Sequence, residues 1–177
     1  MSLSKLFWWV YRLSPVELVW ILLVCTLVFF WLLRRLRGRS FPAAMLMLWL
    51  GAALWATILN RSGETMGSFQ AIPFHSYREM MDTGNREILR SSFMNVVLFY
   101  PGGLLLAAIL PKRWRLAVTV VAFAALSMSI EIAQHTLFLG RGEIDDVLHN
   151  TLGAVCGCLA LSLEPKLSQS KRRRKSP

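Results

Sequence analysis

The fold is decided by apolar stretches long enough to cross a bilayer, and one of them reads LAVTVVAFAALSMSIEIAQHTLFL (residues 116–139). About 20 helical residues cross the hydrocarbon core of a membrane, which is roughly 30 Å thick. Four further stretches of this kind occupy residues 16–33, 41–59, 93–110 and 147–163. The sequence therefore predicts an all-α membrane protein, a bundle of five transmembrane helices.

Composition supports the same class, because 55% of the 177 residues are hydrophobic, whereas soluble domains usually contain about 45–50%. A single membrane domain is expected over residues 16–163. An aromatic segment precedes it (residues 1–15) and is expected to lie in the membrane interface. A basic tail (residues 164–177) follows the membrane domain.

The distribution of charge predicts the orientation. The 20 Lys and Arg residues outnumber the ten acidic residues, and the formal net charge is +10. Thirteen of the basic residues fall in residues 34–40, residues 111–115 and the tail. Basic residues hold loops in the cytoplasm, so the N-terminus is expected outside and the C-terminus inside a multi-pass protein of the cytoplasmic membrane. The partners expected are membrane lipids, and no nucleic acid.

With this topology, the polar residues in and beside the spans lie at one depth near the outer face. A charged side chain facing lipid costs roughly 2.5 kcal/mol or more, so these groups should face the bundle or a wet cavity. The residues expected to bind a ligand there are Arg61, Asn95, Glu131, Gln134, Arg141, Asp146 and Asn150. The candidates for an acid or base are Glu131, His135, Asp145 and Asp146.

Helical spacing groups several of these side chains. Glu131, Gln134 and His135 stand at positions i, i+3 and i+4, and therefore on one helix face. Asp146 and Asn150, four residues apart, share another face. The spacing offers no closed set of His and carboxylate ligands, so neither a metal nor a cofactor is expected.

Small residues in the last stretch indicate close helix packing. Gly153 and Gly157 are four residues apart, which allows the backbone of another helix to approach.

Several of these residues also form an ordered pattern along the chain. It runs through Asn95-x-x-x-Phe99-x-Pro101-x-Gly103, Ser129-Ile130-Glu131-x-x-Gln134 and Gly140-Arg141-x-x-x-Asp145-Asp146-x-x-x-Asn150-Thr151-x-Gly153. Leu59-x-Arg61 and Ile72-Pro73-Phe74 precede it. Over roughly residues 41–163 the pattern resembles the VanZ-like family of integral membrane proteins. The family usually shows an Asn shortly before the Pro-Phe pair, where the nearest amide here is Gln70.

The resemblance implies a role in the cell envelope, since the family is named for a protein that gives low-level resistance to teicoplanin-type lipoglycopeptides. That protein acts without the usual change of the D-Ala-D-Ala terminus of peptidoglycan. The first interpretation is a protein that binds or modulates a lipid-linked envelope component, such as a cell-wall precursor, or a lipoglycopeptide. The second is a membrane-embedded acid/base enzyme acting on a lipid headgroup or phosphate. The third is a structural subunit whose polar cluster only fixes the helix register.

Overall fold

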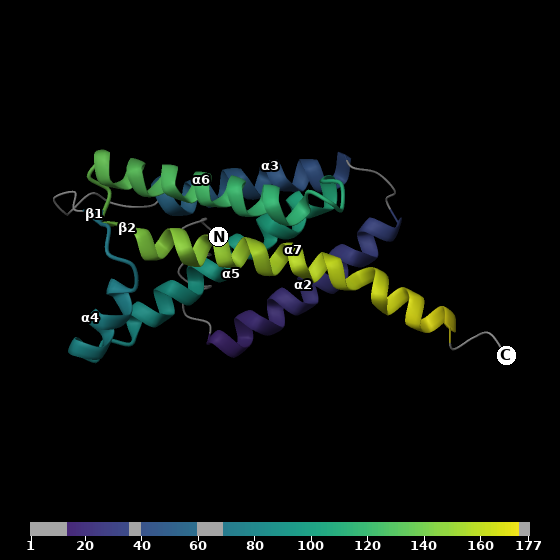
Figure 1. Cartoon of the computed structure of the whole chain (residues 1–177), viewed down its shortest axis with the longest axis horizontal. Coiled ribbons are helices and arrows are strands. Elements are labelled where there is room, and N and C mark those ends of the chain that lie inside the picture. Colours follow the sequence, from purple (N-terminus) through teal and green to yellow (C-terminus); the bar gives the residue numbers. More distant parts are fainter. Residues whose placement is uncertain (1–13, 36–39, 60–68, 174–177) are drawn as a thin grey trace, which may run out of the picture.

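The structure, a computed structural model, describes residues 14–35, 40–59 and 69–173. Arg61, most of the expected interfacial segment and the end of the tail lie outside these residues. The elements follow one another as α2 (Pro15–Arg35), α3 (Ser40–Leu54), the π-helix η1 (Trp55–Leu59), β1 (Phe69–Gln70), α4 (His75–Thr83), α5 (Glu87–Ile109), α6 (Arg115–Thr136), β2 (Gly142–Glu143) and α7 (Ile144–Arg173) (Figure 1).

Four of the described helices are long and apolar enough to cross a membrane. They cover Val16–Leu33, Ser40–Ile58, Glu87–Ile109 and Arg115–Thr136, which correspond to the first four predicted spans. The chain is thus a mostly helical membrane protein. The fifth predicted span, residues 147–163, is helical as part of α7, and its role as a span stays a prediction.

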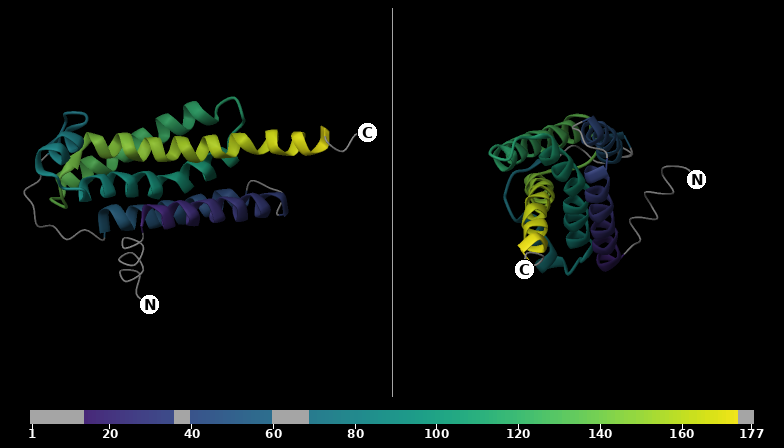
Figure 2. Two further views of the ribbon diagram at one scale, coloured as in Figure 1. Left: turned by 90° about the horizontal axis from the view of Figure 1, so that it is seen from below. Right: turned by 90° about the vertical axis from the view of Figure 1, so that its right-hand side faces the viewer.

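The chain runs back and forth along an elongated bundle, as two perpendicular views show (Figures 1 and 2). At one end lie β1, β2 and α4, together with the last turns of α6 and the first turns of α7. The C-terminal part of α7 and the connection between α5 and α6 lie at the other. We call the first of these the polar end, because most of the predicted site residues fall there.

Helix α7 packs along α5, and the glycines of α7 allow this contact. A Cβ atom added at Gly157 would lie 2.7 Å from the backbone nitrogen of Leu104, and one at Gly153 would lie 2.9 Å from the carbonyl carbon of Val96. Both distances are shorter than real side chains permit. The predicted close packing of the last apolar stretch is therefore confirmed.

An aromatic group fills the core between α3, α5 and α6. Phe99 of α5 is fully buried and meets Trp49 and Phe123 edge to face, with centroid separations of 5.6 and 6.1 Å. Such pairs stabilise a core beyond the area that they bury. Trp49 and Phe123 also meet each other at 5.5 Å, so the core holds α3 and α6 together on the same side of α5.

The region between the second and third predicted spans contains more regular structure than expected. The predicted spans 41–59 and 93–110 leave residues 60–92 as one long connection between them, but β1, α4 and the first turns of α5 lie within it. Helix α4 has nine residues, too short and too polar to give a transmembrane signal. The start of α5 was not predicted either, because Glu87 and Arg90 give it a polar composition.

Candidate functional site

The polar end brings together residues from α4, α6, α7 and both strands. Of the predicted site residues, Glu131, Gln134, Asp145 and Asn150 are buried. Asn95, His135 and Asp146 are half-buried, and Arg141 is exposed. Arg61 is not among the residues that the structure describes.

The inward face of α6 carries Ser127, Glu131 and Gln134, all at most 2% exposed. One carboxylate oxygen of Glu131, Oε2, accepts a 2.9 Å hydrogen bond from the backbone N–H of Glu143 in β2. This bond ties the turn after α6 back onto the helix. The adjacent Gly142 has no room for a side chain, since an added Cβ would lie 2.9 Å from the carbonyl oxygen of Glu131.

Gln134 links α6 to the π-helix η1. Its Nε2 group donates a 2.9 Å hydrogen bond to the carbonyl oxygen of Thr57. A π-helical turn leaves the regular α-helical bonding pattern, and such turns occur frequently at functional sites. The hydrogen bond to Thr57 holds the amide of Gln134 in one orientation. The oxygen of this amide, Oε1, is buried and has no hydrogen-bond partner in the described part of the chain.

Asn150 has a similar arrangement between α7 and α6. Its Nδ2 group donates a 2.7 Å hydrogen bond to the hydroxyl oxygen of Ser127. Its oxygen, Oδ1, is buried, and the described residues supply it with no hydrogen-bond partner. We refer to Gln134 Oε1 and Asn150 Oδ1 as the two open amide oxygens. Buried acceptors normally find a donor, so these two atoms indicate where a ligand or a water could bind.

Asp145 holds α4 against the start of α7. Its two carboxylate oxygens accept hydrogen bonds from the backbone N–H groups of Phe74 (2.6 Å) and Ser76 (2.9 Å). Phe74 adopts a left-handed conformation with φ of 62°, which is rare for a bulky residue. Burial alone would raise the pKa of Asp145, but the hydrogen bonds from Ser76 and Phe74 outweigh it and hold that pKa below its ordinary value.

Two further contacts join α4 to the same region. The hydroxyl of Ser76 donates to Glu143 Oε2 at 3.1 Å. The hydroxyl of Tyr77 lies 2.7 Å from His149 Nε2, within hydrogen-bonding distance. Together with Asp145, these contacts fix the position of α4 over the start of α7.

Within residues 69–173, Arg141 forms no ion pair with Glu131. Among the described residues its guanidinium pairs with Glu79 at 3.5 Å and Glu143 at 3.9 Å. The reason is local: the strand β2 begins at the next residue, and the Glu143 N–H bonds to Glu131. Arg141, about half exposed, thus lies on the rim of the polar end. Glu131 and Asp146 each have an interaction partner.

The remaining candidate, His135, packs its ring edge to face on Phe69 at a centroid distance of 6.1 Å. In the part of the chain that the structure describes, no group of three or more His, Cys, Asp and Glu side chains could hold a metal ion.

The sequence did not single out Ser76, Tyr77, Ser127 or Glu143. Ser127 could have been found, because it precedes Glu131 by four residues and so shares its helix face. Ser76 and Tyr77 gave no comparable signal, since their partners lie about 70 residues further along the chain.

The fold and the site define a polytopic helical membrane protein with buried carboxylates and amides at one end of its bundle. Residues 18–164 match the model of the VanZ/LLP1 family. The chain therefore belongs to this family, as the motif pattern predicted. No curated protein and no solved structure gave a significant match.

Proposed function

We propose that this protein binds a lipid-linked component of the cell envelope through the polar end of its bundle. The observation that carries this proposal is the pair of open amide oxygens. Both are buried and oriented by hydrogen bonds of their own amide nitrogens. They suit a headgroup that offers hydroxyl or amide N–H donors, as the sugar and peptide of a cell-wall precursor do. Sequestering such a precursor would account for low-level teicoplanin resistance.

The carboxylates favour binding over catalysis. Both oxygens of Asp145 are occupied by backbone N–H groups, and Glu131 accepts a backbone N–H as well. A general acid or base must be free to reach the proton that it transfers. These two carboxylates instead fix the frame that holds the open amide oxygens in place.

We further propose that the polar end faces the outer side of the cytoplasmic membrane, with five spans and the C-terminus in the cytoplasm. The asymmetry of basic residues supports this orientation. Reporter fusions at residues 37, 75, 113, 143 and 172 should then report inside, outside, inside, outside and inside. An internal fusion that reports the opposite side would contradict the topology.

Ligand-dependent stabilisation tests the binding function. A ligand that binds only the folded protein at 100 times its Kd adds about 2.7 kcal/mol of stability. We expect a polyprenyl-linked cell-wall precursor to raise the Tm of the purified full chain in detergent. Phosphatidylglycerol at the same concentration should raise it much less. Equal shifts with both lipids would contradict recognition of the precursor headgroup.

A further inference from the structure

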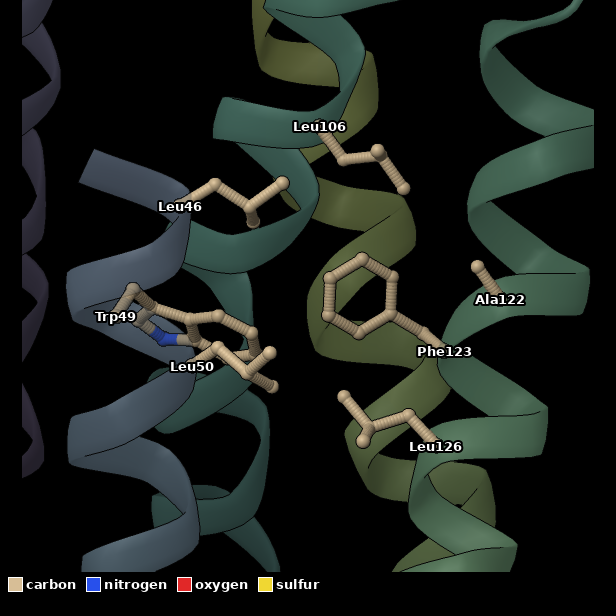
Figure 3. Close-up of a pocket in the computed structure, with 7 residues that line it drawn as sticks. All are labelled: Leu46, Trp49, Leu50, Leu106, Ala122, Phe123 and Leu126. Carbon is tan, nitrogen blue, oxygen red and sulfur yellow. The ribbon is translucent and has the colours of Figure 1, made fainter. Parts of the chain in front are cut away.

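An apolar cavity of about 190 Å³ lies between α3, α5 and α6. Figure 3 shows its side chains pointing into the space between α3 and α6, with α5 behind. It is lined by Leu46, Trp49, Leu50, Leu106, Ala122, Phe123 and Leu126. We call this space the α3/α6 groove.

The groove offers nothing to a polar ligand. The only polar atom in its lining side chains, the indole nitrogen of Trp49, already donates a 2.9 Å hydrogen bond to the carbonyl oxygen of Leu98. Apolar cavities of about 150 Å³ stay dry and accept apolar molecules. A ligand in this groove is therefore hydrocarbon.

The surroundings of the groove indicate the source of that hydrocarbon. The groove lies within three of the four helices that are long enough to cross a membrane. Next to it, α3 exposes Met47 and Leu48 (68% and 66%), and α6 exposes Val121 (69%). Large apolar side chains exposed on spanning helices face lipid, so the chains of lipids are the molecules at the mouth of the groove.

On α6, the residues that line the groove come directly before those of the polar end. Leu126 in its lining is followed directly by Ser127, the partner of Asn150. Gln134 lies two turns further, roughly 11 Å along the axis at about 1.5 Å per residue. Phe123, which lines the groove, belongs to the same core cluster as Ile130. Along the axis of α6, the hydrophobic lining and the buried hydrogen-bonding groups thus lie within the length of one amphiphilic molecule.

We propose that the α3/α6 groove holds one hydrocarbon chain of the lipid whose headgroup binds at the polar end. The inference rests on the proposed function for the headgroup, while the chain site stands on the lining and position of the groove. The ligand class is then an intact lipid that reaches the site sideways from the bilayer, in preference to a free headgroup from the aqueous phase.

Photolabelling of the full chain in liposomes tests the chain site. The probe is a polyprenyl-linked cell-wall precursor with a diazirine in its hydrocarbon chain, and labelled residues are mapped by mass spectrometry. Labelling should concentrate on Leu46, Leu50 and Leu126 relative to the lipid-facing Leu48. In Ala122→Trp, which fills the groove, labelling of these residues should fall to the level of Leu48. The matched variant Ala125→Trp, on an exposed position of α6 outside the lining, should label as the wild type does.

Labelling spread evenly over the exposed faces of α3 and α6 would overturn the groove as a chain site. So would unchanged groove labelling in Ala122→Trp. If that variant no longer folds, Leu126→Phe fills the same lining with a smaller change and must give the same loss. Groove labelling that persists when no headgroup preference is found would keep the chain site and contradict the proposed function. If headgroup binding is unaffected by a filled groove, the proposed function stands and the chain site is contradicted.

Discussion

Replacing Gly157 by leucine is expected to separate α7 from α5 and to cause the largest loss of stability of any single change considered. The leucine Cβ would collide with the backbone at Tyr100 and Leu104, and backbone atoms inside a helix cannot move aside as a flexible side chain can. Overpacking of a core costs about 1–3 kcal/mol and occasionally more. Thermal unfolding in detergent should show a Tm that is several degrees lower, or no folded protein.

Gly51→Leu is the matched control for this prediction. Gly51 also lies inside a spanning helix, α3, but an added Cβ there would meet no atom within 4 Å. Its Tm should stay the same or rise slightly, because leucine favours a helix more than glycine does. A Gly157→Leu variant as stable as Gly51→Leu would show that α7 and α5 do not approach as described.

The second large effect is expected for Asp145→Ala, which removes the acceptor of two backbone N–H groups. Hydrogen bonds to charged groups contribute about 1.5–3 kcal/mol each, and the buried N–H of Ser76 would lose its partner. The amides of α4 should therefore exchange with deuterium much faster than in the wild type. Asp82→Asn, an exposed change on α4 itself, should leave the exchange unchanged. Equal protection of α4 in Asp145→Ala and the wild type would show that the Asp145 carboxylate does not hold α4 in place.

The same carboxylate gives a pH dependence of definite sign. The pKa of Asp145 is lower in the folded protein than its ordinary value, so its ionised form stabilises the fold above about pH 4. Protection of α4 should hold from neutral pH down to that value and then fall as the pH drops through the folded pKa. Asp145→Ala should lack this additional acid sensitivity.

The sequence predicted the four described helices that are able to span a membrane, because hydrophobicity alone determines them. The third predicted span began at residue 93, whereas α5 begins at Glu87, since a helix continues beyond the bilayer without an apolar signal. Helix α4 was not predicted, because it depends on contacts with Asp145 and His149 that are distant along the chain.

For the site, helical spacing predicted that Glu131 and Gln134 share one helix face. Both side chains are buried, as expected of a face turned toward the bundle. The partners of these groups could not be predicted in the same way. The hydrogen bond from Gln134 to the Thr57 carbonyl depends on how α6 packs on η1. The ion pairs of Arg141 depend on where α4 lies.

The most direct test of headgroup binding compares the precursor-induced rise in Tm between two α6 variants. Gln134→Leu removes one open amide oxygen, whereas Ser129→Ala changes an exposed residue whose hydroxyl bonds only within its own helix, to the Ala125 carbonyl. Losing one hydrogen bond of roughly 1.4 kcal/mol weakens binding about tenfold. We expect a clearly smaller rise for folded Gln134→Leu and a wild-type rise for Ser129→Ala. A full rise in Gln134→Leu would contradict headgroup binding at the polar end.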